Sequence, residues 1–591
     1  MNDQKNLILA IVISVFIIVI FQFLFPQQTM IIPEEEISTK QDNQTLTSID
    51  QTQEININKK INRDDIIKKI ELDIKSGERI LIKNENIIGS IRLKGAIIDD
   101  LILTKYKDSL DENSKNIQLF SPNDAKNPYY IEIGWKQLSN DQNIIDLPND
   151  NTIWSASSNQ LSPNNPINLN WINNQNIEFN IKISVDNEYM FNIDQEIINN
   201  SSNKISLFPY RFIKRINEPD TIGFFILHEG LISLSNEELL EKDYDDLIDD
   251  CSSQNNQKSD YCNKKSKGGW LGFTDKYWLA ALIPNQSEEI NINYRHNINN
   301  ETDDFRAGYA GNIINIEPKN NIKYSGKLFA GAKVVKILDK YQNQENIIRF
   351  NDAIDWGWFS FLTKPIFYSI NWFYQKVGNF GLAIIAFTIL MRIVLFPLAQ
   401  ASFKSMAKMK KLQPEIQRLK ELHGDDRQKM QQDLMAMYKK EGANPVAGCL
   451  PIVLQIPIFF ALYKTLFVTI EMYHAPFYGW IHDLSAPDPA GILILFGLIN
   501  SPNYLSFVNN YLSLVNIGVL PIIMGISMYL QQKLNPAPAD PVQAKIFTLL
   551  PIVFTFILAG FAAGLVLYWS VNNILSILQQ WIIQRKIIKQ S

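Results

Sequence analysis

The sequence predicts an α-helical polytopic membrane protein of six spans that carries a large exported all-β domain. Several apolar runs near twenty residues long are almost free of charge, although the mean hydropathy of the 591 residues is only −0.10. Residues 1–345 contain 36 Lys+Arg and 49 Asp+Glu, whereas residues 346–591 contain 20 and 12. The front part also alternates apolar and polar residues, as half-buried strands do. An acidic exported part therefore precedes a basic membrane part.

The apolar runs give the positions of the spans, because a helix needs about 20 apolar residues to cross a bilayer. The run at residues 7–25 follows Lys5 and could be read as a signal peptide. It is longer than a signal core, and the following FPQQ lacks a small-residue cleavage site, so we predict an uncleaved signal anchor. The other predicted spans are residues 380–400, 449–470, 515–533, 543–560 and 564–584. The last two divide one continuous apolar stretch at a tight turn near Gly560.

The distribution of basic residues predicts the orientation of the spans. The segment 401–447 has ten Lys+Arg against six Asp+Glu, and the tail 585–591 is also basic. By contrast, the predicted outer loop 471–514 contains no Lys or Arg. Both termini should therefore be cytoplasmic, and the β domain should lie on the outer side.

The exported part divides into a tether and a domain. Residues 27–60 are rich in Gln, Thr, Asn and acidic residues, which predicts a flexible segment. Residues 61–345 contain strings such as EFNIKISV, in which every second residue is apolar. We predict a β-sandwich there. Cys251 and Cys262 flank a short polar loop, and an oxidising compartment would permit a disulfide, although two free thiols are an equal alternative.

Two further segments are predicted to lie at the membrane surfaces. Residues 356–377 are rich in aromatics and favour an interfacial amphipathic helix, because Lys364, Pro365 and Asn371 disfavour a seventh span. In the segment 401–447, apolar residues recur at helical spacing on both sides of Gly424, which predicts a hairpin of two helices.

Arg392 lies near the middle of the predicted second span. An arginine there costs about 2.5–3.5 kcal/mol on insertion scales, and the predicted spans contain no Asp or Glu to neutralise it. We therefore predict a water-filled groove open to the cytoplasm with Arg392 on its wall. Thr388 lies one turn earlier on the same helix face. Polar residues of the third and sixth spans could face the same groove, namely Gln455, Asn572 and Asn573, or could bond between helices.

The segment from MAKMKKLQPEIQ to IFFALYKTL, together with RIVLFPL, PFYGWIHDLSAPDP, NPAPADPVQAKIF and GLVLYWSVNNILSILQQ, resembles the YidC membrane-protein insertase family. The resemblance covers essentially all of residues 355–589 and is weaker in SKGGWLGFTDKYWLAALIP of the front domain. It is closest to the Gram-negative form with a large periplasmic domain, whose fold is a β-supersandwich. After DLSAPDP, residues 490–518 are longer than in familiar family members, and we expect an outer-surface or re-entrant segment there.

The resemblance implies a function and a set of functional residues. It implies an inner-membrane insertase and chaperone, not an enzyme, acting alone or with the Sec translocon and its accessory subunits, without a cofactor or metal. Arg392 matches the family's groove arginine. Substrate-contacting positions would be Thr388, Ile456, Pro457 and Trp569, where Trp569 replaces an expected Tyr. Implied partners are nascent membrane proteins, the bilayer, and the ribosome through the hairpin and the basic tail.

Two other classes of protein compete with the insertase. A membrane-anchored periplasmic carbohydrate-binding or carbohydrate-active protein is suggested by the supersandwich resemblance, but fold alone does not establish activity. His228 and His296 are the only histidines in the front domain, and they form no convincing catalytic set. An ion-coupled transporter is disfavoured by the lack of intramembrane carboxylates. The basic residues form no aromatic platform, so no nucleic-acid specificity is expected.

Overall fold

The computed structural model describes residues 63–589 except for several short segments. The segments left out are residues 112, 139–143, 224–225, 253–258, 300–301, 424–425, 443–444, 500–511, 513–514 and 536–540. The predicted signal anchor at residues 7–25 and the tether at residues 27–60 lie outside the described residues.

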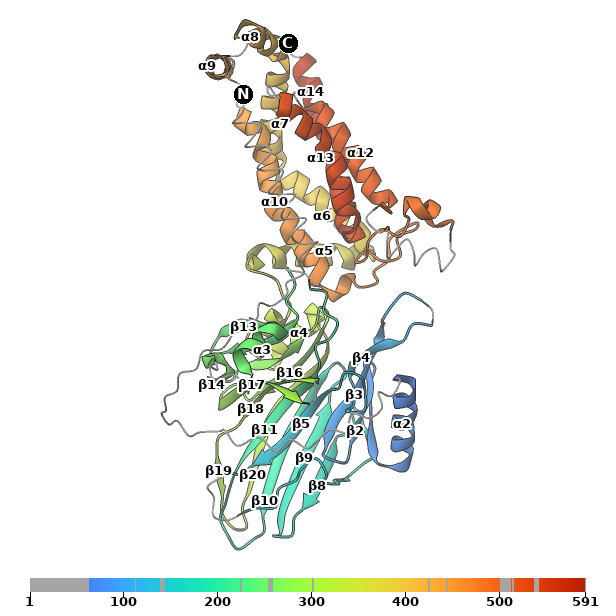
Figure 1. The fold of residues 1–591 in the computed structure, drawn as a ribbon, viewed down its shortest axis with the longest axis vertical. Coiled ribbons are helices and arrows are strands. Elements are labelled where there is room, and N and C mark those ends of the chain that lie inside the picture. The colour runs from blue at the N-terminus through green and yellow to red at the C-terminus, as the bar shows by residue number, and fades with distance from the viewer. Residues whose placement is uncertain are drawn as a thin grey trace. The chain divides into compact units, whose positions relative to one another are not determined.

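The front domain contains two large β-sheets that share one hydrophobic core (Figure 1). The 11-stranded sheet has the order β14-β17-β18-β11-β5-β3-β2-β1-β7, with β19 paired to β11 and β4 to β3. The 9-stranded sheet has the order β13-β12-β15-β16-β20-β10-β9-β8-β6. The strands of the first sheet are β1 Arg79–Lys83, β2 Ile87–Arg92, β3 Ile97–Lys107, β4 Asn116–Phe120, β5 Tyr129–Lys136, β7 Gln160–Leu161, β11 Ile205–Ile216, β14 Asn263–Lys267, β17 Glu289–Asn299, β18 Thr302–Ala310 and β19 Ile314–Ile316. Those of the second are β6 Ser155–Ala156, β8 Ile167–Ile172, β9 Ile177–Val185, β10 Met190–Asn199, β12 Gly230–Ser235, β13 Glu238–Lys242, β15 Trp270–Thr274, β16 Trp278–Pro284 and β20 Asn321–Ala332.

The alternating sequence pattern of this domain is confirmed by the burial of its strands. Phe179, Ile181 and Ile183 of β9 are fully buried, whereas Lys182 between them is exposed. β9 and β10 pair antiparallel, with Ile183 opposite Ile193. Because side chains alternate across a strand, this register sends the apolar residues of both strands into the core.

Within the described residues of this domain, three α-helices accompany the sheets, so the domain is not purely β. They are α2 Arg63–Ser76, α3 Tyr244–Cys251 and α4 Val335–Gln344. Asp243 caps α3 by accepting a hydrogen bond from the Asp246 amide, which explains where this helix starts. A disulfide joins Cys251 at the end of α3 to Cys262, with their Cα atoms 5.7 Å apart.

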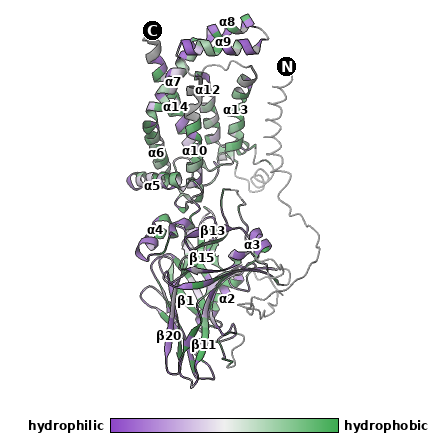
Figure 2. Ribbon diagram, turned by 90° about the vertical axis from the view of Figure 1, so that its left-hand side faces the viewer, coloured by the Kyte–Doolittle hydropathy of each residue, from purple (hydrophilic) through white to green (hydrophobic). Residues whose placement is uncertain are grey.

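The C-terminal region is helical, and most of its long helices are strongly apolar (Figure 2). Its elements are α5 Ser360–Val377, α6 Phe380–Val394, α7 Phe396–Lys411, α8 Gln413–His423, α9 Arg427–Lys440, α10 Pro445–Val468, α12 Val519–Leu534, α13 Pro541–Ala559 and α14 Ala563–Lys589. Short 3-10 helices are η1 Asp260–Cys262, η2 Phe350–Ala353, η3 Ile470–Met472 and η4 Ile492–Gly497. By length and hydropathy, none of the described helices qualifies by itself as a membrane span, whereas the bent pair α6 and α7 does so jointly.

Two helices that the sequence predicts to be continuous are broken. The predicted second span 380–400 ends as a straight helix at Val394, and α7 continues at an angle of 66°. The first helix of the predicted hairpin is likewise divided at Leu412 into α7 and α8. Pro397 and Pro414 lie in the first turns of the new helices, where their missing N–H groups need no partner.

Two further helix ends have identifiable local causes. α5 lies within the predicted interfacial segment and ends at Gly378, whose φ of +70° is accessible to glycine at low energy. α13 ends at Ala559 and α14 starts at Ala563. In this turn the amides of Ala563 and Gly564 donate to the carbonyls of Ala486 and Leu484, so the loop before α12 fixes the start of α14.

Candidate functional site

Arg392 lies in the last turn of α6, beside α14. Its Nε donates to Oδ1 of Asn572 over 2.9 Å, and its Nη2 donates to the carbonyl of Asn572 over 3.0 Å. The side chain is half-buried. Among the described residues, no carboxylate lies within ion-pair distance of this guanidinium. Arg392 is therefore a cation that is held in place by hydrogen bonds to neutral acceptors.

A second polar pair lies one helical turn away on α14. Gln455 of α10 donates through Nε2 to the hydroxyl of Tyr568 over 2.6 Å. Tyr568 and Asn572 are four residues apart and so lie on the same face of α14. Arg392 of α6 and Gln455 of α10 each form hydrogen bonds with this face of α14. Tyr568 is not among the residues predicted above, although its four-residue spacing from Asn572 is a signal that could have found it.

Two other predicted groove residues, Thr388 and Asn573, form hydrogen bonds to partners outside these two polar pairs. Thr388 is fully buried, and its hydroxyl donates to the carbonyl of Ile384 in its own helix. Asn573 is also buried, and its amide donates to Ser527 of α12 over 3.1 Å. Asn573 thus makes an interhelical bond, which is the common use of a lone polar residue between apolar helices. Asn572 and Tyr568 are buried to a similar degree, at 7% and 1% exposure, so the hydrogen-bond partners and not the burial distinguish the two groups.

The other predicted contact positions lie on an apolar surface. Ile456 and Pro457 of α10 are exposed, Ile456 by 49%. Trp569 is half-buried and packs between Phe459 of α10 and Phe554 of α13, with ring centroids 4.7 and 6.1 Å away. Trp569 thereby connects α10, α13 and α14 through aromatic contacts.

A second charged residue lies inside a predicted span and is not among the predicted site residues. Lys464 of α10 is 6% exposed and pairs with Asp355, whose Oδ2 lies 2.5 Å from its Nζ. The same Nζ donates to the carbonyl of Ile226, and Asp355 Oδ2 also accepts the amide of His228 over 2.9 Å. A lysine within a long apolar run was the signal that could have found this pair. The pair joins α10 to the end of the β domain.

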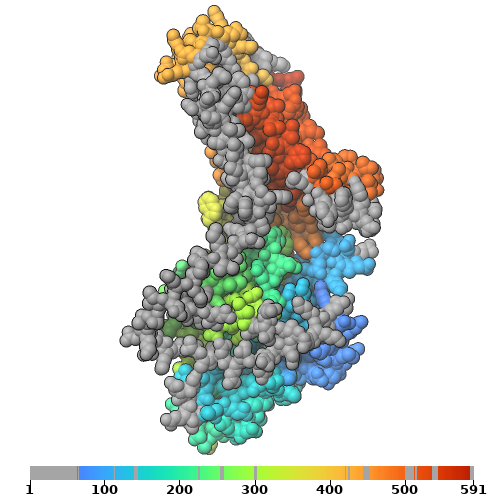
Figure 3. Space-filling view, in the orientation of Figure 1, coloured from blue at the N-terminus to red at the C-terminus, as the bar shows by residue number. Residues whose placement is uncertain are grey.

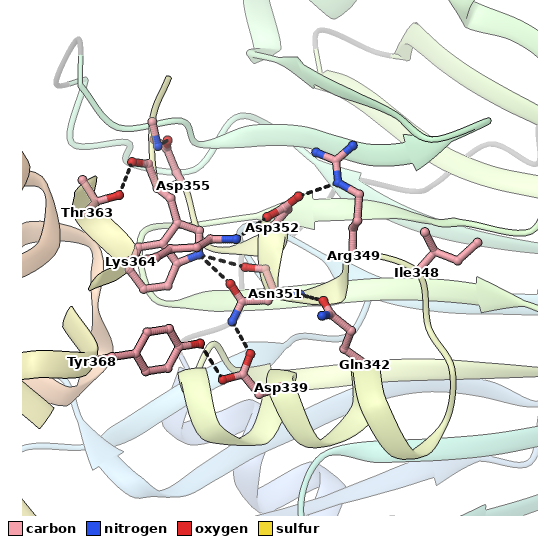
Figure 4. Close-up of polar contacts among 12 residues, drawn as sticks. Asp339, Gln342, Ile348, Arg349, Asn351, Asp352, Asp355, Thr363, Lys364 and Tyr368 are labelled. Carbon is pink, nitrogen blue, oxygen red and sulfur yellow. Dashed lines mark hydrogen bonds and ion pairs between the residues drawn. The ribbon is translucent and has the colours of Figure 1, made fainter. Parts of the chain in front are cut away.

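The segment between the β domain and α5 is held by a polar network (Figure 4). Tyr368 of α5 donates to Oδ2 of Asp339 in α4 over 2.8 Å, and Asn351 donates to the other oxygen of the same carboxylate. Lys364 of α5 pairs with Asp352 over 2.8 Å. These contacts fix α5 to α4 and η2.

Lys333, which follows β20, gives this region a pH dependence. The side chain is 2% exposed and donates to Thr274, and burial lowers the pKa of its amine from 10.5 to about 8. The unfolded chain therefore binds this proton more tightly, so stability should rise with pH between about 8 and 10.5. We expect Lys333→Met to stabilise the protein at pH 7 by up to about 3 kcal/mol, and the difference to shrink toward pH 10. Thermal unfolding of both proteins from pH 7 to 10 measures this.

Lys323→Met is the control, because Lys323 is an exposed partner of Asp194. Its effect on unfolding should change little over the same pH range. A Lys333→Met effect that stays constant from pH 7 to 10 would contradict the assignment.

Both histidines of the β domain have structural hydrogen bonds. His296 is fully buried, and its Nε2 lies 2.8 Å from Oδ1 of Asp303. The ring of His228 bonds the carbonyl of Leu231 over 2.8 Å. The two side chains therefore serve the packing of the sheets and do not point to a sugar-processing site.

Comparison with known proteins places these features in a family. The model of the 60Kd inner membrane protein family matches residues 372–590, and that of the YidC periplasmic domain matches residues 79–369. The two matches define an inner-membrane protein with a periplasmic domain. Membrane protein insertases YidC from Rickettsia felis and Granulibacter bethesdensis are 42% and 43% identical, each over 99% of this chain and at least 98% of their own length. The chain therefore belongs to the YidC membrane protein insertase family, and it is a non-enzymatic insertase.

Among solved structures, an active YidC insertase crystal structure with the first transmembrane domain resolved is similar to this chain. It is 17% identical, with a TM-score of 0.35, and the match covers 85% of this chain and 92% of that one.

Proposed function

We propose that Arg392 receives the hydrophilic end of a nascent membrane protein in a groove formed by α6, α10 and α14. The observation that carries this proposal is the pairing of Arg392 with neutral oxygens of Asn572 only, among the described residues. A cation without a counter-charge in an apolar surrounding attracts an anion strongly, because the local dielectric constant is low. An acidic tail would supply that counter-charge for the time of its passage.

The apolar surface beside this site would guide the rest of the substrate. Ile456 and Phe460 of α10 are exposed by 49% and 47%, and Ile393 next to Arg392 is exposed by 66%. A hydrophobic segment could slide along these side chains into lipid while its polar tail stays near Arg392. Burial of apolar area, worth about 25 cal/mol per Å², would drive the transfer, so no covalent step is required.

The proposal includes the six-span arrangement with both termini in the cytoplasm and the domain boundaries given above. The ten Lys and Arg residues of the segment 401–447 and the lack of Lys and Arg in the segment 471–514 support this orientation. In this arrangement α8 and α9 lie on the cytoplasmic side and α5 lies at the outer surface. Trp358, just before α5, is 89% exposed and Trp372 of α5 is 56% exposed, and such exposed aromatic side chains suit an interfacial position.

The positive charge of the cytoplasmic segments suggests partners beyond the nascent chain and the bilayer. The basic hairpin and the tail with Arg585, Lys586 and Lys589 could contact the ribosome or anionic headgroups. Cooperation with the Sec translocon and its accessory subunits is proposed from the family resemblance.

Site-specific photo-crosslinking tests the substrate path. A photo-reactive amino acid at Ile456 should crosslink to a short inserting substrate several-fold more than one at Ile526. Ile526 is a matched control, because it is 56% exposed but lies on α12, which packs against α13 and α14. Equal yields at the two positions in reconstituted vesicles would contradict a path along α10.

A further inference from the structure

An exposed apolar segment precedes α12, and neither the groove nor the spans account for it. Residues 490–499, called here the apolar finger, include η4 and read AGILILFGLI. Leu495, Phe496 and Leu498 are exposed by 53%, 55% and 83%. The space-filling view shows this part of the chain in orange, beside the red C-terminal helices (Figure 3).

The backbone of the apolar finger is strained where these side chains are presented. Leu495 and Phe496 have φ angles of +48° and +58°, a left-handed conformation that bulky residues rarely adopt. Glycine or asparagine would adopt it more easily. Strain of this kind persists where the surrounding structure holds it and is typical of functional segments.

The base of the apolar finger is firmly fixed to α12. Asp488 accepts hydrogen bonds from the amides of Ala490 and Leu520, over 2.9 and 2.6 Å, and from the indole of Trp480 over 2.9 Å. Gly491 and Gly518 form a bridge across the base. The hydrogen bonds at Asp488 and the bridge between the two glycines therefore attach the base of the apolar finger to the start of α12.

The lack of charged residues around the apolar finger indicates what kind of partner it contacts. Between Asp488 and Lys533 the sequence contains no Asp, Glu, Lys, Arg or His. The apolar exposed surface continues onto α12, where Ile526 and Leu530 are exposed by 56% and 50%. A polar protein surface would find no charge to pair with here, whereas acyl chains require an uncharged surface.

We propose that the apolar finger inserts into the acyl region of the outer leaflet of the membrane as a non-spanning anchor beside the start of α12. Its ten residues are too few to cross the bilayer as a helix. This inference rests on the inner-membrane location of the family and on the proposed outer position of the 471–514 loop. It does not depend on any role of Arg392.

A fluorescent label with two quenchers tests the proposal in the full-length protein. Leu498→Cys is labelled with bimane in a Cys449→Ala background, where the other two cysteines form the disulfide. The protein is reconstituted into phosphatidylethanolamine and phosphatidylglycerol vesicles that contain a lipid with a nitroxide on its acyl chain. Ile153→Cys is the matched control, because Ile153 is an equally apolar, 73% exposed side chain of the β domain.

We expect the lipid nitroxide to quench the label at Leu498 at least threefold more than the label at Ile153, and aqueous iodide to quench it at least threefold less. Phe496→Cys should behave like Leu498→Cys, which guards against a local effect of one variant. Iodide quenching equal to that of Ile153 would overturn the proposal. Protection from both quenchers would also overturn it, because protein would then cover the apolar finger. Substrate insertion measured in the same vesicles reports separately on the Arg392 groove.

Discussion

Replacing Arg392 with alanine should slow the insertion of substrates with acidic tails about tenfold. A unit charge about 10 Å from the guanidinium is attracted by about 1.7 kcal/mol at an effective dielectric constant of about 20. Loss of that attraction corresponds to a little more than a factor of ten in rate. The assay is protease protection of short substrates in vesicles reconstituted with each variant. Substrates should differ only in the charge of the translocated tail.

Two controls distinguish charge from packing. Arg392→Lys keeps the cation but loses the two-atom contact with Asn572, so it should retain most of the activity on acidic tails. Substrates with neutral tails should be affected much less by Arg392→Ala. A loss that is equal for neutral and acidic tails, or no loss at all, would contradict an electrostatic role for this residue.

Replacing Lys464 with alanine should have the largest effect on stability, about 3–5 kcal/mol, because it leaves Asp355 as a buried charge without its partner. The side chains of Lys464 and Asp355 are only 7% and 12% exposed. The double variant Lys464→Met with Asp355→Leu should recover much of this loss, since it removes both charges. Equilibrium unfolding in detergent micelles, followed by fluorescence, measures the coupling energy.

The ion pair between Lys364 and Asp352 provides the control. It belongs to the same junction, but its side chains are 30% and 19% exposed. Water therefore screens the pair, and Lys364→Ala should cost only about 0–1 kcal/mol. If Lys464→Ala were as mild as Lys364→Ala, Lys464 would not hold α10 to the β domain.

Prolines show how far local sequence rules predict the helices. Pro397 and Pro414 begin new helices, whereas Pro365 and Pro551 lie inside α5 and α13. In the continuous helices, Ser369 and Thr555 donate to the carbonyls of these internal prolines. The local sequence does not distinguish a proline that starts a new helix from one that lies inside a helix. The difference depends on how the neighbouring helices pack.

The sequence predicted that a polar site surrounds Arg392, but it predicted only some of the residues that form this site. Arg392 stands out in the sequence because a charge in an apolar run is expensive. Polar residues of the sixth span were candidates for the same reason, but their spacing leaves open which helix each one faces. The structure turns Asn572 toward α6 and Asn573 toward α12, although they are neighbours in sequence.

The sequence by itself determined the division of the protein into an acidic β domain and a basic apolar helical region, since periodicity and charge are local properties of the chain. It also determined that Arg392 must have polar hydrogen-bond partners among apolar helices. Only the tertiary structure decided which residues pair with each other: Asn572 with Arg392, Tyr568 with Gln455 and Asp355 with Lys464. These partners lie 109 to 180 residues apart in the chain. No local pattern specifies such pairs, because they form only when the packing of the helices brings the chain segments together.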